Sequence, residues 1–259
     1  MLFYKVGPSP KKWWGMLMTS IDGGRSWTVA RRLPEEIYGP IKNKPVELSN
    51  GDILCPSSEE VKYNPRKPSR WRVHFERTGD FGNTWERSGV LNARAIQAIQ
   101  PSILFLGRNK LLAVGRTRQN RLFEVVSKNG GKTWGSMKLH ILPNPNSATD
   151  AVTLRDGRHI LVYNHVRKDS GQWDGPRTPL NVAISNNGRE WWAALVLENS
   201  PGEYSYPAVI QTADGMVHIT YTWNRRRIRH VVLDPACLKP EPFLRGKWPT
   251  WIKTKKVLK

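Results

Sequence analysis

One short motif recurs four times along the chain at nearly constant spacing. It starts at Ser20 (SIDGGRSW), Thr78 (TGDFGNTW) and Ser127 (SKNGGKTW), and in a degraded form at Ser185 (SNNGREWW). Asp and Asn side chains bond to nearby backbone amides and Gly adopts positive φ, so the middle of the motif predicts a tight turn. The Trp that closes each motif then begins the next strand. The chain is therefore a repeat protein.

A second series of turn pairs runs in step with the motifs, each pair flanked by strand-like apolar runs. The motif starts are separated by 58, 49 and 58 residues and the turn pairs by 58, 48 and 58. The pairs are Asn50-Gly51, Arg108-Asn109, Asp156-Gly157 and Asp214-Gly215. A unit of about 50 residues with two hairpin turns predicts a four-stranded antiparallel sheet, and such units stack into an all-β propeller. A β-sandwich with chance turn similarity is the alternative, and four in-phase matches disfavour it.

Both ends of the chain are expected to lie within a blade. If the strands of a blade are named A to D, the segments from Leu2, Trp13 and Ser26 read as B, C and D, so the first strand A is missing. The segments SYPAVIQTA, MVHITYTW and RRIRHVVLD read as A, B and C, with no fifth motif. We expect about five visible blades over residues 1–240 and a basic tail over 241–259. Unpaired edge strands in an open propeller favour association.

The repeated motifs resemble the Asp boxes of the sialidase superfamily, in particular its BNR-repeat members. IQPSIL from Ile99 and GEYSYPAVIQTADGMVHITYTW from Gly202 are similar to that family's recurrent strands, and the resemblance covers nearly the whole chain. It implies a sialidase-like propeller of the six-bladed type, so this chain either lacks the N-terminal blade or closes a smaller ring. It also implies that the Asp boxes are structural turns away from the active site, and we expect Trp27, Trp85 and Trp134 to pack between blades.

Charge is the unusual feature of the composition. The chain has 41 Lys and Arg against 21 Asp and Glu, a net charge of +20, which attracts polyanions such as acidic glycans, nucleic acid or anionic membranes. No zinc pattern, RNA-binding aromatic motif or Gly-rich phosphate loop accompanies it, so nucleic acid is an unlikely partner and no metal or cofactor is expected. A basic surface that only keeps the protein soluble is the alternative.

Other sequence signals are weaker. No apolar run of membrane-spanning length occurs. Cys55 and Cys237 are too few for a disulfide scaffold; two buried thiols are expected, with a single bridge as the alternative. The resemblance is compatible with secretion, but a signal peptide could only precede a start that already lies inside the fold.

Chain topology predicts where a site should lie. Both tight turns of each unit fall at one end, so the starts of strands A and the ends of strands B converge at the other, where loops on a rigid scaffold usually carry chemistry. Cations there suit a carboxylate, amides suit hydroxyls and aromatics suit sugar rings. The predicted substrate-binding residues at this end are Lys44, Gln100, Arg116, Asn164, His165, Tyr206 and Trp223.

The resemblance adds catalytic candidates. Tyr204 matches the family's nucleophilic tyrosine, although a buried β-forming role is the alternative. Arg177 could stand for the second of three substrate-binding arginines, with a solvated loop charge as the alternative. The Arg-Ile-Pro-like motif of the first arginine is absent, and the catalytic Asp has no clean match. The third arginine has no counterpart between the fourth box and Tyr204, which leaves Arg116 and the Arg225 to Arg229 cluster as substitutes. The candidate acids, with solvated surface charges as the alternative, are Glu59, Glu60 and Asp150.

The resulting functional hypothesis is exo-glycoside hydrolysis of a terminal acidic sugar. A catalytically degenerate glycan-binding propeller is the main alternative, supported by the missing arginine and acid. A scaffold that binds polyanions is the third, and it would require the basic residues to gather in a patch away from the central site. The sugar, the linkage and the oligomeric state stay open.

Overall fold

A computed structural model describes residues 1–62, 64, 66, 68–92 and 95–252. Within them five antiparallel sheets follow one another along the chain, and the strands of each sheet pair in sequence order. The first two sheets consist of β1 (Leu2–Val6), β2 (Trp14–Met18) and β3 (Arg31–Arg32), then β4 (Val46–Glu47), β5 (Ile53–Val61), β6 (Arg70–Thr78) and β7 (Glu86–Arg87). The third and fourth are β8 (Ala98–Phe105), β9 (Leu111–Thr117), β10 (Arg121–Ser127) and β11 (Lys138–Pro143), then β12 (Asp150–Thr153), β13 (His159–Tyr163), β14 (Leu180–Ser185) and β15 (Trp192–Glu198). The fifth consists of β16 (Tyr204–Gln211), β17 (Val217–Trp223) and β18 (Arg227–Leu233).

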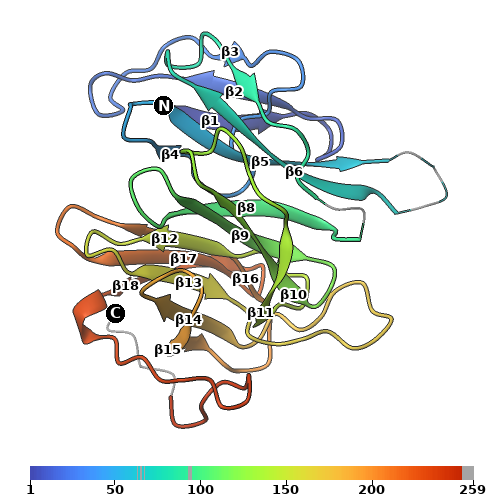
Figure 1. The fold of residues 1–259 in the computed structure, drawn as a ribbon, viewed down its shortest axis with the longest axis vertical. Helices are drawn as coiled ribbons and strands as arrows, with labels where there is room; N and C mark the ends of the chain where they lie inside the picture. Colours follow the sequence, from blue (N-terminus) through green and yellow to red (C-terminus); the bar gives the residue numbers. More distant parts are fainter. Residues whose placement is uncertain (63, 65, 67, 93–94, 253–259) are drawn as a thin grey trace.

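This arrangement confirms the predicted all-β propeller. The first and last sheets have three strands each, as the reading of the chain ends predicts, and the three between them have four. The first strands of the last three sheets pack against one another in turn, β8 against β12 and β12 against β16, and β5, the second strand of its sheet, packs against β8. In Figure 1 the sheet of β1 to β3 lies at one end of the long axis and β15 lies near the other.

The repeated motifs form the predicted turns. In the first, the Asp22 carboxylate accepts the backbone amides of Arg25 and Ser26 at 2.9 Å each, and the Trp27 indole donates to the Gly24 carbonyl at 3.0 Å. The degraded fourth motif keeps this geometry, because the Trp191 indole donates to the Gly188 carbonyl at 3.1 Å. Local hydrogen bonds therefore define the turn, and they also form in the fourth motif, which is one residue shorter than the others.

The closing Trp residues join one sheet to the sheet before it. Trp134 stacks on Phe75 of β6 at 3.9 Å between ring centroids, and Trp85 packs edge-on to Phe3 of β1 at 6.2 Å. The prediction that these two pack between blades is confirmed. For Trp27 it is wrong, because the indole is 41% exposed. Trp27 belongs to the first sheet, and no earlier sheet exists within the described residues to cover it.

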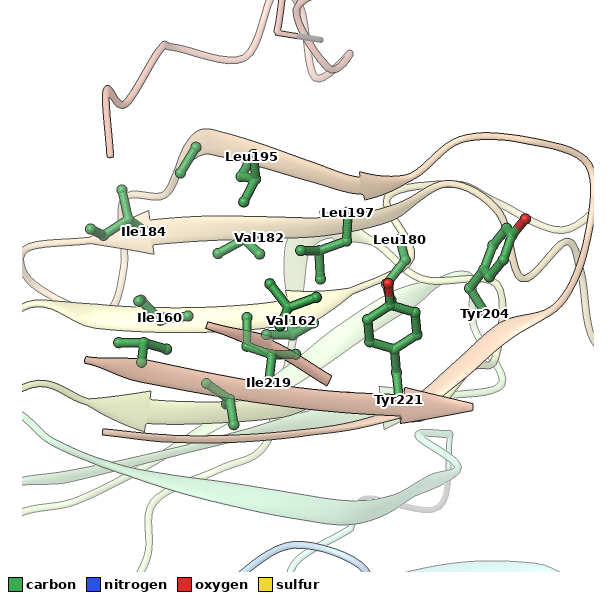
Figure 2. Packing of buried hydrophobic residues seen from close by; sticks show 14 of the residues in the cluster. Ile160, Val162, Leu180, Val182, Ile184, Leu195, Leu197, Tyr204, Ile219 and Tyr221 are labelled. Carbon is green, nitrogen blue, oxygen red and sulfur yellow. The ribbon is translucent and has the colours of Figure 1, made fainter. Parts of the chain in front are cut away.

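The largest apolar cluster fills the space between the fourth and fifth sheets. Val162 and Val182 of the fourth sheet meet Ile219 of the fifth, and Tyr204 and Tyr221 close the cluster at the end nearest the strand A starts (Figure 2). This burial fixes how the fifth sheet lies against the fourth.

Residues 241–252, the described part of the segment that the sequence predicts to be a basic tail, continue along the outside of the fourth sheet. Glu241 and Ala193 exchange two backbone hydrogen bonds of 2.9 Å, and Phe243 and Trp248 pack around His165. The expectation of two buried thiols is half right: both cysteines are free, but only Cys55 is buried while Cys237 is exposed. None of the described helices is long and apolar enough to span a membrane.

Candidate functional site

In four of the sheets, a residue near the start of the first strand has an unusual backbone conformation. Lys42, Gln100, Asn146 and Tyr206 have φ of 69°, 57°, 62° and 51°, a region that non-glycine residues rarely adopt. In β8 and β16 this residue lies where the register shifts, between Ile99 and Ser102 and between Ser205 and Ala208. Bulges redirect side chains, and backbone strain concentrates at functional sites.

Three of these residues surround the guanidinium of Arg116, at the end of β9. Its Nε and Nη2 donate to Asn146 Oδ1 at 3.1 and 2.8 Å, and its Nη1 donates to Gln100 Oε1 at 3.4 Å. Burial lowers the pKa of Arg116, and the positive charge of nearby Arg177 lowers it further. The charge of Tyr206 and a hydrogen bond with Tyr206 act in the opposite direction and raise this pKa. Residues of three sheets thus contact one guanidinium at the end of the propeller where the chain topology predicts a site.

A second arginine lies in an aromatic sandwich beside it. The guanidinium carbon of Arg118 lies 4.0 Å from the Trp71 ring centroid and 4.1 Å from that of Trp173, and Arg116 lies 5.0 Å from Trp71. Burial lowers the pKa of Arg118 to about 10, although the Glu60 carboxylate raises it. Trp173 is 52% exposed, so an indole face and a cation adjoin the Arg116 centre at the surface.

The carboxylate of Asp150 has a full set of donors. It accepts Lys44 Nζ at 2.9 Å, Ser102 Oγ at 2.9 Å and the backbone amides of Ala151 and Val209 at 2.9 and 2.8 Å. These donors come from four successive parts of the propeller: the segment before β4, then β8, β12 and β16. The predicted acid Asp150 therefore joins the sheets, and its role in catalysis stays a prediction.

Lys42 lies in the same central region. Its Nζ donates to the carbonyls of Thr149 and Pro207 at 2.7 and 2.5 Å. Burial lowers the pKa of Lys42 to about 7, while Asp150 raises it. Lys42 thus binds backbone carbonyls ahead of the fourth sheet and on β16.

Tyr204 is at the predicted end of the propeller, but its phenol is buried between the fourth and fifth sheets. It lies near Trp223, with ring centroids 6.4 Å apart, and Asn164 Nδ2 donates to its carbonyl at 3.2 Å. Burial raises its pKa, and the Glu198 carboxylate raises it further, which is the opposite of what a nucleophilic phenol needs. The more exposed phenol of the pair belongs to Tyr206.

The remaining predicted residues lie around the centre with partners of their own. Glu59 pairs with Arg72 and Arg87, each at 3.5 Å. Arg177 pairs with Asp174 at 3.0 Å. His165 Nε2 bonds the Gly246 carbonyl at 2.9 Å beneath the C-terminal segment.

The structure therefore brings together four of the predicted binding residues. Gln100, Arg177 and Tyr206 lie around the guanidinium of the fourth, Arg116. Sequence reasoning missed Asn146, Arg118, Trp71 and Trp173. Asn146 could have been found, because it lies near the start of β12 as Gln100 lies near the start of β8. Nothing in the sequence indicated that Trp173 would contact another sheet.

Several buried oxygens in the central region have no protein partner within the described residues. They are the side-chain oxygens Asn43 Oδ1, Ser57 Oγ, Thr149 Oγ1 and Asn164 Oδ1. Buried polar atoms without a hydrogen-bond partner are rare in folded proteins. Over the described ranges, no group of three or more His, Cys, Asp or Glu side chains is arranged to hold a metal ion.

Five sheets with Asp-box turns at one end and a shared polar centre at the other define a sialidase-like β-propeller. A family model of the BNR repeat-like domain matches residues 1–219, and the chain belongs to this family. A curated relative, the anhydrosialidase of Macrobdella decora, is 22% identical over 235 residues, covering 81% of this chain and 30% of the relative.

Solved structures share the fold at low sequence identity. A K499G mutant of the NanB sialidase from Streptococcus pneumoniae has a TM-score of 0.67 at 14% identity, covering 88% of this chain and 37% of that one. The intramolecular trans-sialidase from Ruminococcus gnavus has a TM-score of 0.66 at 16% identity, covering 89% and 52%. The chain thus spans about half or less of the length of these relatives.

Proposed function

We propose that the chain acts on glycans through the Arg116 centre, as a sialidase-like exo-glycoside hydrolase for a terminal acidic sugar. The observation that carries this proposal is the convergence of Gln100, Asn146 and Tyr206, from three sheets, on one buried guanidinium. A guanidinium in a site of reduced dielectric pairs strongly with a carboxylate. The relatives' names, sialidase and anhydrosialidase, support the same substrate class.

Within this proposal Arg116 binds the sugar carboxylate. The carboxylate of Glu60 takes the phenol proton as the Tyr206 oxygen attacks the anomeric carbon, and it passes this proton to the glycosidic oxygen as the bond to that oxygen breaks. Water then attacks the anomeric carbon, the bond to the Tyr206 oxygen breaks, and a proton of the water returns to that oxygen as the sugar is released. A neutral phenol suits this task because a carboxylate nucleophile would be repelled by the substrate's own carboxylate. Exposure is what favours Tyr206 over the buried Tyr204 of the sequence-based prediction.

The test combines sugar release with sugar binding. The protein is incubated with a panel of acidic glycans, and released monosaccharides are measured by chromatography. Tyr206→Phe should abolish release and keep binding, since one exposed hydroxyl is lost, whereas Tyr204→Phe should keep both. The reverse pattern would restore Tyr204 as the nucleophile. Arg116→Met should weaken binding about 10- to 100-fold, the range expected for a lost charged hydrogen bond.

A glycan-binding propeller without hydrolysis is the second candidate. It is favoured by the state of the predicted carboxylates, because Asp150 is held by Lys44 and Glu59 by Arg72 and Arg87. Binding by the wild type without release of sugar from any glycan would support this candidate. Absence of both binding and release across the panel would overturn the Arg116 site altogether.

A further inference from the structure

Exposed cations line three depressions at the opposite end of the propeller, among the A–B turns and Asp boxes of the second to fourth sheets. We call this surface the turn face. Its exposed cations are Arg108, Lys110, Lys128, Lys132, Lys138, Arg155 and Arg189. They come from turns that are far apart in sequence, and the repeat brings these turns to the same end of every sheet.

Two of the depressions share lining residues, and the third lies among the turns of the second and third sheets. The largest, about 1090 Å³, lies between the third sheet and the fourth Asp box, and it shares Lys110 and Arg189 with a neighbour of about 640 Å³. The third, about 300 Å³, is lined by Arg108 and Lys132. Gly130 donates to the Asn109 carbonyl at 2.7 Å, which joins the turn and the Asp box of the third sheet. The turn face therefore extends across three sheets.

These cations lack anionic partners. Within the described part of the chain none of the seven forms an ion pair, whereas Lys44 and Arg225 elsewhere are paired with Asp150 and Glu203. Glu124 is the one acidic residue among those lining the three depressions, and its carboxylate lies 3.8 Å from His140. Unpaired like charges along a groove raise the local concentration of anions and are suited to a polymer that meets several of them at once.

We propose that the turn face binds an anionic polysaccharide, a chain of carboxylated or sulfated sugars, independently of the Arg116 centre. The largest depression also offers the hydroxyls of Thr133 and Ser136 and the aliphatic side chain of Ile141, which is 76% exposed. Hydroxyls and apolar edges match the alternating surfaces of a sugar chain. A nucleic acid is matched less well, because the Trp134 ring is already stacked on Phe75 and base stacking needs a free aromatic face.

Position distinguishes this surface from the proposed active site. The Arg116 centre is built from the starts of strands A and the ends of strands B, whereas the turn face is built from the turns at the other ends of the same strands. A polymer held at the turn face would leave the Arg116 centre free. The two proposals can therefore fail separately.

The experiment measures binding by titration calorimetry with heparin and polygalacturonate, and with a single-stranded oligonucleotide as the competing class. Lys110→Ala, Lys128→Ala and Arg189→Ala are combined in one variant. We expect polysaccharide affinity to fall about tenfold or more, since several exposed ion pairs are lost together. Wild-type binding should weaken steeply as salt is raised, because exposed charge contacts are screened.

The matched control combines Lys12→Ala, Lys239→Ala and Arg245→Ala, which removes the same charge from exposed positions outside the three depressions. It should change affinity less than about twofold. An equal loss in both triple variants would show that net charge alone attracts the polymer and would overturn the proposal. So would failure of the wild type to bind either polysaccharide, or tighter binding of the oligonucleotide. Arg116→Met should leave heparin binding unchanged whatever it does to the released sugars.

Discussion

At the scale of single residues, His140 illustrates how burial determines charge in this basic protein. Its imidazole is buried on β11, where Nδ1 accepts the Leu142 amide at 3.0 Å. Burial lowers its pKa to about 4, while a hydrogen bond with the backbone of Arg189 raises it. Glu124 at 3.8 Å favours the charged form, but it is partly exposed and too distant to offset the lost hydration.

This burial predicts a loss of stability in acid. The pKa of His140 is about 4 in the folded protein and 6.5 in its ordinary state, so below pH 6.5 the unfolded chain binds the proton more tightly. The contribution of neutral, buried His140 to the free energy of unfolding is fully present above about pH 6.5, and it falls by about 3 kcal/mol as the pH drops to about 4. Denaturant unfolding at several pH values measures it. In His140→Gln this part of the acid dependence should disappear.

The exposed His230 provides the matched control. His230→Gln should retain the wild-type loss of stability between about pH 6.5 and 4. The burial argument would be contradicted if His140→Gln and the wild type lost the same free energy of unfolding over that range.

At the scale of elements, the Asp-box Trp residues connect each sheet to the one before it. Trp134→Ala removes an indole stacked on Phe75 and should cost about 3 to 5 kcal/mol of unfolding free energy. Trp27→Ala removes an indole that is 41% exposed, so its cost should stay near or below about 1 kcal/mol. Urea unfolding of both variants tests the comparison, and equal costs would argue against inter-sheet packing as the role of the motif.

The strands and turns could be predicted because their signals are local. An Asp that bonds amides three and four residues on, as Asp22 does, determines its turn without help from distant residues. The strand-like apolar runs that flank the turns then indicate the strands. The incomplete first and last sheets followed from the same count of motifs.

For the candidate site, the sequence could predict only the end of the propeller at which it lies. Which of Tyr204 and Tyr206 reaches the centre depends on the bulge between Ser205 and Ala208, and a shift of one position reverses the face on which side chains lie. The contact of Trp173 with Arg118 depends on the path of the long loop between β13 and β14. Neither is encoded in the spacing of the repeats.

At the scale of the whole molecule, the two ends of the propeller differ in how their charges are used. At the strand A starts, Lys44 is paired and Arg116 is bonded by amide side chains. At the turn face the cations are exposed and unpaired within the described residues. Part of the excess of positive charge therefore lies where an external anion can reach it.

Asp150 tests whether the sheets behave as one cooperative unit. Its two carboxylate oxygens accept Lys44, Ser102 and the amides of Ala151 and Val209, so donors face both oxygens. In Asp150→Asn the new amide NH₂ group, itself a donor, must face the donors around one of these two oxygens, so those hydrogen bonds are lost. The ion pair with Lys44 is lost as well. We expect a loss of about 3 to 5 kcal/mol, the range for breaking a buried ion pair from one side.

The measurement is urea unfolding followed by Trp fluorescence, which reports on several sheets, and by circular dichroism. Asp156→Asn is the control, because its carboxylate is solvent-accessible in a turn and pairs with Arg158 alone at 2.6 Å; it should cost less than about 1 kcal/mol. If the Asp150 carboxylate holds the centre together, both probes should shift to lower urea with coincident transitions. A variant that unfolded at the wild-type midpoint, or lost only the fifth sheet while the others stayed folded, would show that the sheets are held by their apolar interfaces and not by this carboxylate.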